Sequence, residues 1–499
     1  MSFHTDHNTL SMVLWSLFLA FMVLLLYVWW KKTSRDPALP PGPPTVPFLG
    51  NILSISPDSM LESFQTYRKK YGDVFSLITG TKTMVIVNGL DTIRDIFIKH
   101  GDIVSERPDT FLTKEISKYK GIISASGEFW KEHRTFSLNA LREFGFGKRN
   151  LESKIMEEVV VLVQELQSKN GQPFNIRTLL AVCVSNIMCS INFGQRFEHD
   201  DKSFVSLIQL INENVSNGSI LFLANIFPFL RYVPGDPLRI RKVLSNAAVI
   251  EEYINQTVKY HEESFDENNI RDFIDAYLKK IKSEESNTRT TFNAEQLVLI
   301  VGDLFVAGTE TTSTALRWFA VFMIRNPEVQ EKMRKEISDV IGNSRYPSMT
   351  DKINLPYTEA VLHEVLRMGC IVPLALPHGL NTDLKYKDFI IPKDAILIPN
   401  LHSILFDPDV FVDPKVFRPE RFLDADRKLV NTEQVLTFSL GRRVCLGESL
   451  ARMELFLFAT TLVQRFQILP ADPAHLPPVK GVLGVSYAPE DFLLKTLNI

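Results

Sequence analysis

The sequence is poor in cysteine and has no excess of charge of either sign. Among its 499 residues are four cysteines, 55 Lys plus Arg and 58 Asp plus Glu, which gives a formal net charge of −3. So few cysteines exclude a disulfide-based scaffold and indicate a reducing compartment. Cys183 and Cys189 lie in an apolar stretch and are expected in the core. The near-neutral balance provides no overall basic field for nucleic acid, although a local basic patch is compatible with it.

Charge is also missing from one long stretch near the N-terminus. The 21 residues from Leu10 to Trp30 carry no charged side chain. As a helix, at about 1.5 Å per residue, they match a hydrocarbon core of about 30 Å. Lys31, Lys32 and Arg35 follow, and no Lys or Arg precedes, so the positive-inside rule predicts a luminal N-terminus and a cytosolic body. A cleaved signal peptide is the alternative, but the basic n-region and the small-residue cleavage site of one are missing.

A proline-rich segment follows this anchor. Pro37 and the run Pro40–Pro44 fix φ and lack N–H donors, so the segment cannot be helical and is expected to form a stiff spacer. The sequence thus divides into a luminal tail with a transmembrane anchor (1–30), a basic and proline-rich hinge (31–50) and a body (51–499).

Helical periodicity dominates the body, without a second linker or an internal repeat. It is strongest over Leu151–Tyr260 and Asn293–Arg367. Short strand-like segments occur at Val74–Ile78, Met84–Val87, Phe389–Ile391 and Ala395–Ile398. This predicts one mainly α domain with small β-sheets (α+β). A domain of about 450 residues exceeds the usual size, so we expect some additional group to organise its centre.

Two segments leave alternatives open. Residues 131–149 contain five basic and two acidic side chains, a local charge of +3, which fits either a solvated helix face or a docking surface for an acidic partner. The apolar segment Ile220–Leu230, interrupted by Pro228, fits either a buried segment or a patch that dips into the membrane.

The most informative segment is FSLGRRVCLG, residues 438–447. Gly441 permits a tight turn, and Gly447 permits the close approach of a flat group. Helical composition resumes directly afterwards, so Cys445 lies at a helix N-terminus, where the dipole and free N–H groups favour a thiolate. No nearby His or Asp provides a base, and no second cysteine completes a zinc site. The pattern therefore predicts a thiolate ligand or an isolated nucleophile.

This segment resembles the haem-binding signature of the cytochrome P-450 superfamily, F-x-x-G-x-R-x-C-x-G, at every fixed position. Further motifs of that superfamily follow its order along the chain: the proline-rich hinge, W-x-x-x-R at Trp130–Arg134, the oxygen-activation motif at Ala307–Thr312, E-x-x-R at Glu364–Arg367 and the PERF element at Phe417–Phe422. The sequence as a whole resembles the microsomal family 2 branch of this superfamily. The resemblance implies the cytochrome P-450 fold, haem b (iron protoporphyrin IX) as cofactor, and attachment to the endoplasmic reticulum membrane with the catalytic domain on the cytoplasmic side.

The resemblance also implies which residues hold the haem. Cys445 would be the axial thiolate ligand of the iron. Two buried propionates need cations and hydrogen-bond donors, for which forked guanidinium groups are suited. The implied cofactor-binding residues are Arg107, Trp130, Arg134, His378, Phe438, Arg443, Cys445 and Gly447.

A buried structural network is implied for Glu364, Arg367 and Arg421. The first two lie at i and i+3 of a helix and can pair. Loss of one partner from such a network costs about 3–5 kcal/mol, and we expect haem retention to suffer with it.

Residues Asn293–Arg325 predict one helix of roughly 48 Å, with a capping residue at its start and Pro327 after its end. Gly308 in its middle costs about 1 kcal/mol relative to Ala. Beside a threonine, such a glycine can open the hydrogen-bond ladder and admit water. By resemblance, Thr311 would support proton delivery to dioxygen and Glu310 would relay protons through water.

The implied reaction is that of a membrane-anchored, unspecific type of monooxygenase, which inserts one oxygen atom of O2 into a lipophilic substrate. The chain has no Rossmann fingerprint, so electrons from NADPH must arrive through a separate flavoprotein reductase, with cytochrome b5 as a second candidate donor; no nucleic-acid partner is expected. Candidate reductase contacts are Lys131, Arg142, Lys148, Arg442 and Arg452. The alternatives are a haem-thiolate isomerase or dehydratase, and a non-catalytic haem carrier or sensor; the intact Gly308–Thr311 turn favours the monooxygenase.

The family's substrate-contact regions correspond here to mostly apolar segments, which suits a lipophilic substrate without naming one. These regions are Arg107–Ala125, Ser206–Phe229, Asp303–Thr311, Ile371–Pro377 and Gly481–Ser486. Their apolar side chains include Phe111, Ile116, Ile122, Leu304, Phe305, Val372, Leu374, Val482 and Leu483. An apolar pocket discriminates by shape, at about 1–3 kcal/mol per methylene.

Overall fold

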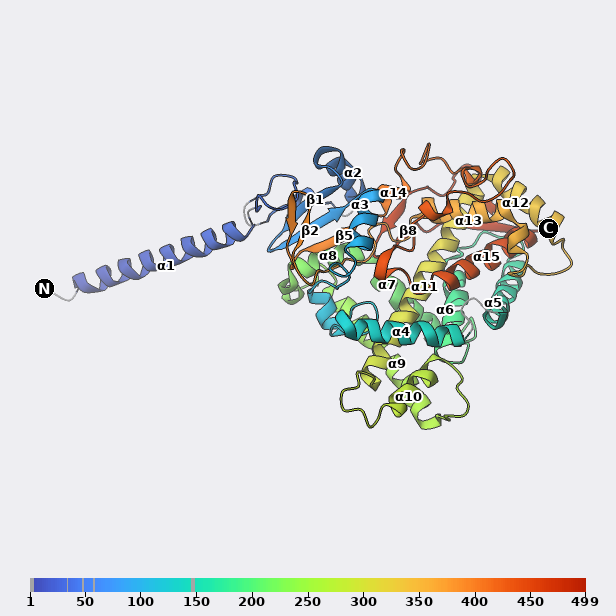
Figure 1. The fold of residues 1–499 in the computed structure, drawn as a ribbon, viewed down its shortest axis with the longest axis horizontal. Helices are drawn as coiled ribbons and strands as arrows, with labels where there is room; N and C mark the ends of the chain where they lie inside the picture. The colour runs from blue at the N-terminus through green and yellow to red at the C-terminus, as the bar shows by residue number, and fades with distance from the viewer. Residues whose placement is uncertain (1–3, 34, 47–48, 57–58, 145–148) are drawn as a thin grey trace.

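The computed structural model describes residues 4–33, 35–46, 49–56, 59–144 and 149–499. Helix α1 (His4–Thr33) stands clear of the body that the other elements form (Figure 1). Its segment Thr9–Val28 has a mean hydropathy of 2.4 and is not covered by the body. Helix α11 is also long and apolar enough to cross a membrane, but more than half of it is buried inside the body. Of the two, α1 is therefore the candidate membrane span, as the sequence predicts.

The body is mainly helical. Its helices are α2 (Met60–Tyr71), α3 (Leu90–Arg94), α4 (Gly127–Glu143), α5 (Arg149–Ser168), α6 (Arg177–Asn192), α7 (Lys202–Ser216), α8 (Gly218–Ile226), α9 (Ile240–Ser264), α10 (Phe273–Ser283), α11 (Ala294–Arg325), α12 (Pro327–Val340), α13 (Pro356–Gly369), α14 (His402–Leu405) and α15 (Glu448–Arg465). Short 3-10 turns include η5 (Pro228–Tyr232), η7 (Pro419–Phe422) and η9 (Gly441–Arg443).

The strands form small, separate sheets. They are β1 (Val74–Thr79), β2 (Lys82–Val87), β3 (Leu384–Tyr386), β4 (Phe389–Ile391), β5 (Ile396–Pro399), β6 (Phe466–Pro470), β7 (Gly481–Leu483), β8 (Tyr487–Pro489) and β9 (Leu494–Asn498). In the largest sheet, β2 pairs antiparallel with β1 (Val74 opposite Val87) and parallel with β5 (Met84 opposite Ile396). β3 pairs with β4, β6 with β9, and β7 with β8, all antiparallel. The four predicted strands are confirmed as β1, β2, β4 and β5.

Helix α11 runs through the middle of the body, among α6, α13 and α15 (Figure 1). Its first residue is capped as predicted, because the side chain of Asn293 accepts a hydrogen bond from the N–H of Gln296 (3.0 Å). Nearly every residue from Thr309 to Ile324 is buried. The apolar character that makes α11 resemble a membrane span is therefore that of a core helix.

The hinge is packed onto the body and is not a free spacer. Its proline-rich part, residues 35–46, is non-helical, as predicted, but the Arg35 guanidinium donates hydrogen bonds to the carbonyl oxygens of Pro40 (2.9 Å), Pro43 (3.1 Å) and Ser76 on β1 (3.0 Å). Gly42 is required there, because a Cβ atom would lie 2.1 Å from the carbonyl oxygen of Ser76. The hinge thus forms part of the fold of the body.

Candidate functional site

The cysteine loop connects η9 to α15 and has a fixed shape. The N–H of Cys445 donates to the carbonyl oxygen of Phe438 (3.0 Å) and closes the loop. Gly441 has a φ of +75°, and a Cβ atom there would lie 2.3 Å from the carbonyl oxygen of Phe97. Only glycine combines this conformation with this close approach, so the loop geometry depends on Gly441.

The Cys445 side chain is accessible although protein surrounds it. It is exposed, yet burial within the surrounding protein raises the pKa of its thiol. Both observations hold for a group that borders an internal space. The backbone N–H groups of Gly447 and Glu448, together with the positive charge of Arg134, pull that pKa downwards. A Cβ atom on Gly447 would meet no atom within 4 Å, so that residue also leaves open space.

A second accessible point lies in the middle of α11. Ala307 is exposed, and Val306, Gly308 and Thr311 beside it are half-buried, whereas most of the helix after Thr311 is buried. The hydroxyl of Thr311 donates to the carbonyl oxygen of Ala307 (2.8 Å), one helical turn earlier. This places the Thr311 hydroxyl beside an open stretch of the helix.

Gly308 lies within a continuous helix and in close contact with a neighbouring one. α11 is an uninterrupted α-helix from Ala294 to Arg325. A Cβ atom at Gly308 would lie 2.5 Å from the sulfur of Met188 on α6. The glycine therefore serves the close packing of α6 against α11.

Three arginines point inward without a carboxylate partner. Arg107, Arg134 and Arg443 form no salt bridge within the described chain. Their hydrogen-bond acceptors are backbone carbonyl oxygens: those of Ile123, Leu376 and Pro377 for Arg107, of Val444 for Arg134, and of Ser105, Ile122 and Ala125 for Arg443. We refer to these three residues as the arginine cluster.

Burial and mutual repulsion disfavour the positive charges of the arginine cluster. Burial, with the nearby charge of Arg134, lowers the pKa of Arg107 to about 10. Burial, with the charges of Arg107 and Arg134, lowers the pKa of Arg443 to about 8. Carbonyl acceptors cannot neutralise these charges, so the site is suited to an anion.

Trp130 and His378 lie in the same region. The indole N–H of Trp130 is buried without a hydrogen-bond partner, and the Arg443 guanidinium lies 3.7 Å from the centre of its ring. Burial, followed by the charges of Arg107 and Arg443, lowers the pKa of His378 to about 3. The neutral ring donates from Nδ1 to the carbonyl oxygen of Val104 (2.7 Å). An unpaired donor and an unneutralised arginine cluster together fit the two carboxylates of a haem.

A separate arginine network is closed. Glu364 and Arg367 on α13 are fully buried and form a forked pair of 2.7 and 2.9 Å. Arg421 on η7 donates to the same carboxylate (3.1 Å). Arg367 also binds the carbonyl oxygens of Leu405 and Pro414, which ties α13 to the segments that follow it. The three residues predicted to form a network thus lie together.

Comparison with known proteins agrees with this geometry. A family model described as Cytochrome P450 matches residues 40–495. The chain belongs to the cytochrome P450 family. It is 40% identical to Cytochrome P450 2C8 of Homo sapiens over 458 residues, covering 91% of this chain and 93% of the relative. It is 41% identical to Cytochrome P450 2C28 of Mesocricetus auratus over 455 residues, covering 91% and 92%, and 39% identical to Cytochrome P450 2H2 of Gallus gallus over 444 residues, covering 88% and 89%.

Family membership confirms several of the predictions made from the sequence. The chain has the P450 fold and is an oxidoreductase with haem as its cofactor. Its microsomal family 2 relatives are membrane-bound monooxygenases, and the apolar helix α1 agrees with attachment to a membrane. P450 enzymes act on lipophilic substrates and receive electrons from redox partners.

The predicted docking residues of this P450 differ in their surroundings. Arg142 and Arg442 are exposed, and Lys131 is exposed beside Glu128 (3.3 Å). Arg452 is turned inward, where it binds Glu448 (2.8 Å) and lies 4.8 Å from the centre of the Phe438 ring. Lys148 lies outside the described residues. The inward orientation of Arg452 indicates support for the cysteine loop, a role that sequence alone did not reveal.

An apolar pocket of about 360 Å³ lies beside the arginine cluster. Leu374 and Leu483, both in predicted substrate-contact regions, contribute to its lining together with Arg107. Phe305, also expected there, is fully buried and packs against Phe193 at 5.6 Å between ring centres, so its contact is with the core. Phe305 faces the core because of how α6 packs against α11, and this packing cannot be predicted from the sequence.

Asp303 was not singled out by the sequence, yet it fixes one wall of the site. Its carboxylate accepts hydrogen bonds from the N–H groups of Ile122 (2.7 Å) and Ile123 (2.8 Å), and burial raises its pKa to about 6. The partners lie about 180 residues away in the chain, so no local pattern could have indicated them.

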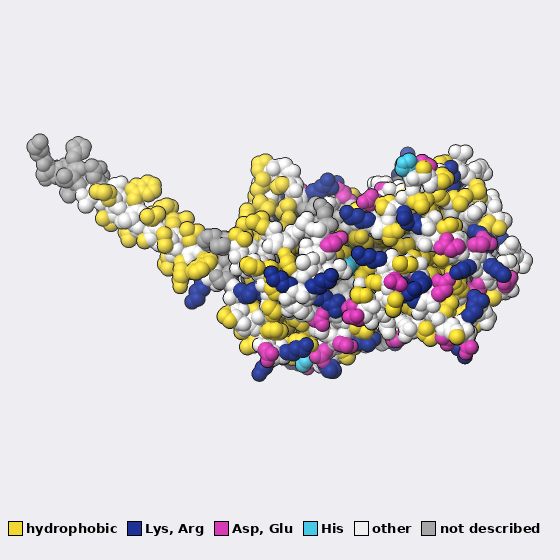
Figure 2. All heavy atoms as spheres, turned by 90° about the horizontal axis from the view of Figure 1, so that it is seen from above, with side chains coloured by type: hydrophobic (Ala, Val, Ile, Leu, Met, Phe, Trp, Pro, Cys, Tyr) yellow, Lys and Arg dark blue, Asp and Glu magenta, His cyan; other side chains and the backbone are white. Residues whose placement is uncertain are grey.

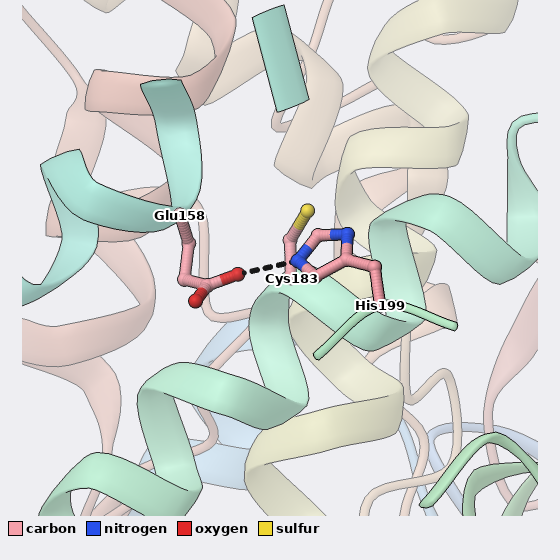
Figure 3. Close-up of side chains that lie close together, drawn as sticks. All are labelled: Glu158, Cys183 and His199. Carbon is pink, nitrogen blue, oxygen red and sulfur yellow. Dashed lines mark hydrogen bonds and ion pairs between the residues drawn. The ribbon is translucent and has the colours of Figure 1, made fainter. Parts of the chain in front are cut away.

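A second cluster, Glu158, Cys183 and His199, resembles a metal site in composition (Figure 3). The carboxylate of Glu158 already binds Nε2 of His199 (2.8 Å) and the guanidinium of Arg196 (2.8 Å). Burial raises the pKa of the Cys183 thiol, which keeps it neutral. The prediction that Cys183 and Cys189 belong to the core is confirmed, since both are fully buried.

Proposed function

We propose that Cys445 is the axial ligand of the haem iron and that the arginine cluster, Trp130 and His378 hold the propionates. The combination of an accessible thiol in a closed loop with three guanidiniums that lack carboxylate partners carries this proposal. Phe438 and Gly447 supply the loop closure and the open space beside the sulfur. When bound, the haem supplies the reductive activation of dioxygen.

The chain's own contribution to the reaction is proton delivery on α11. We propose that Thr311 presents its hydroxyl to the open side of the helix and that the buried carboxyl of Glu310 supplies protons to it. Burial raises the pKa of Glu310, which favours its protonated form. The apolar pocket orients a lipophilic substrate and excludes water from it.

The electron donor is proposed to be an NADPH-dependent flavoprotein reductase, with cytochrome b5 as a second donor. Lys131, Arg142 and Arg442 provide exposed positive charge for such acidic partners. Lys148 belongs to this proposal by sequence alone. Charge steering of this kind weakens as ionic strength rises.

For the membrane arrangement, we propose that 1–30 is a luminal tail and anchor, 31–50 the hinge and 51–499 the catalytic domain on the cytoplasmic side of the endoplasmic reticulum. Phe229 and Tyr232 are 60% and 73% exposed. Apolar side chains gather on the end of the body nearest α1 (Figure 2). This favours a membrane contact for the segment that includes Pro228 over a fully buried one.

The test combines a spectrum with an assay. The reduced protein with carbon monoxide is expected to show the red-shifted Soret band of a thiolate ligand, and Cys445→Ala is expected to abolish it, whereas Cys183→Ala retains it. NADPH with reductase is expected to drive oxygen incorporation into a lipophilic substrate. A red-shifted Soret band without oxygen consumption would favour an isomerase, a dehydratase or a non-catalytic haem carrier. A red-shifted band that persists in Cys445→Ala would refute the assignment of Cys445 as the ligand.

A further inference from the structure

The C-terminal hairpin β7–β8 is fastened to α11 at several points. The indole N–H of Trp318 donates to the carbonyl oxygen of Tyr487 (2.8 Å). Arg317 donates to the carbonyl oxygen of Pro489 (2.7 Å) and to the carboxylate of Asp491 (3.1 Å). These contacts fix where the turn between the two strands lies along the helix.

At that turn, Ser486 reaches the carboxyl group of Glu310. The Ser486 hydroxyl donates to Oε1 of Glu310 (3.1 Å), and the hydroxyl of Thr314 donates to the same oxygen (3.1 Å). Ser486 is 4% and Glu310 5% exposed. In so buried a location, water does not readily replace a lost hydroxyl donor.

These contacts determine the direction of the Glu310 side chain. Glu310, Thr314 and Arg317 follow at i, i+4 and i+7 and share the face of α11 that the hairpin covers. Thr311 is one residue further along and so points about 100° away, towards the open side. The Ser486 and Thr314 donors therefore hold the Glu310 carboxyl in one position, on the turn of α11 that also carries Thr311.

We propose that Ser486 is a positioning residue for proton delivery, whose hydroxyl holds the Glu310 carboxyl on the hairpin side of α11. Leu483, Gly484 and Val485 of the same hairpin line the apolar pocket, so one hairpin contacts both the pocket and the Glu310 carboxyl. The inference rests on the roles proposed above for Glu310 and Thr311.

The charges around Glu310 set the sign of the expected effect. Burial raises its pKa, whereas the donors Ser486 and Thr314 and the charges of Arg177 on α6 and Arg317 on α11 lower it. Asp491, which pairs with both arginines, completes the charged groups on this side. Removal of the Ser486 donor raises the pKa further, so the carboxyl gives up its proton less readily.

The first experiment compares Ser486→Ala with Ser486→Thr in the full-length holoenzyme with reductase. Loss of one such hydrogen bond corresponds to roughly a fivefold change in an equilibrium. We expect Ser486→Ala to raise the ratio of hydrogen peroxide to oxidised product by up to about fivefold, and to move the acidic group in the pH profile to higher pH. Ser486→Thr, which keeps the hydroxyl, is expected to restore both. An Ala variant with an unchanged ratio and profile would overturn the proposal.

A second measurement separates positioning from packing. In a Glu310→Gln background, the Ser486→Ala change is expected to have no further effect on the peroxide ratio, because the group that it positions is gone. Equal effects in both backgrounds would mean that Ser486 acts through the hairpin alone. Infrared difference spectra against Glu310→Gln report the protonated carboxyl directly, and its titration is expected to shift upwards in Ser486→Ala. Thr314→Ala provides a second variant that removes a donor from the same oxygen without altering the hairpin.

Failure of the inference and failure of the proposed function give different results. Loss of the thiolate-type carbon monoxide spectrum in the unaltered protein would refute the haem-thiolate assignment itself. An intact spectrum in all variants, with no shift in the infrared titration, would refute only the role of Ser486.

Discussion

Two groups of inward-facing arginines in this P450 differ in what faces them. Arg367 and Arg421 surround the carboxylate of Glu364, and their charges are matched within the protein. The arginine cluster, Arg107, Arg134 and Arg443, donates its hydrogen bonds to carbonyl oxygens and forms no salt bridge within the described residues. A matched network holds segments of the chain together, whereas an unmatched one leaves positive charge for a ligand. This difference between the two groups supports our proposal that the arginine cluster holds the cofactor.

The largest effect is expected from the matched network. Glu364→Gln leaves two buried guanidiniums without their counter-charge and is expected to lower the free energy of unfolding by about 3–5 kcal/mol. Urea unfolding, with haem content measured alongside, checks this. Asp426→Asn, at an exposed pair with Lys428, is the matched control and is expected to change stability by less than about 0.5 kcal/mol. Similar losses in both variants would remove the distinction between network and surface pair.

The arginine cluster is expected to respond with the opposite sign. Arg443→Met removes an unneutralised charge, so the haem-free protein is expected to keep its stability or gain about 1 kcal/mol. Haem transfer to a scavenger protein is expected to accelerate by about 10- to 100-fold, the value of a charge-assisted hydrogen bond. Arg442→Met, at the exposed neighbouring position, is expected to retain haem normally. A haem-free Arg443→Met protein that is several kcal/mol less stable would place this arginine with the structural network.

Acid is expected to weaken the haem-free protein through His378. Its folded-state pKa of about 3 lies below the unfolded value of about 6.5. As pH falls below 6.5, the unfolded chain therefore takes up a proton that the folded chain refuses, at a cost of about 2 kcal/mol by pH 5. His378→Gln is expected to remove this part of the acid slope in urea unfolding at several pH values. The exposed His475→Gln variant is expected to leave the slope intact, and bound haem is expected to reduce it.

The smallest effect concerns the unpaired indole N–H. Trp130→Phe keeps most of the ring but removes the buried donor, so the haem-free stability is expected to change little. Haem retention is expected to fall by about fivefold, the value of one hydrogen bond. Haem transfer kinetics measure this directly. An unchanged retention would exclude Trp130 from the contacts that hold the cofactor.

Local patterns predicted much of the site. The cysteine loop depends on Gly441 and on a helix that begins directly after it, and both can be read from spacing. The long helix α11 was predicted with its cap because Asn293 and Pro327 mark its limits. The pair Glu364 and Arg367 follows from its helical spacing.

Contacts across the chain could not be predicted in this way. Ser486 and Glu310 form a hydrogen bond although they are 176 residues apart in the sequence. Similarly, β6 pairs with β9 because the packing of the core brings the two strands together. The packing role of Gly308 was not predicted, because Met188, the residue that it contacts, belongs to another helix. Arg452 was predicted to be a docking residue. Its contact with the ring of Phe438 could not be predicted, because it depends on how the cysteine loop packs against α15.

The Arg35 contacts change how the anchor acts on the enzyme. Because the Arg35 guanidinium bonds the hinge to β1, the hinge that follows α1 is fixed to the body and is not a flexible tether. We expect a movement of the hinge to act on β1, the edge strand of the β1–β2–β5 sheet. A shortened form without α1 preserves this edge when it retains Arg35, whereas one that starts after the prolines uncovers Ser76.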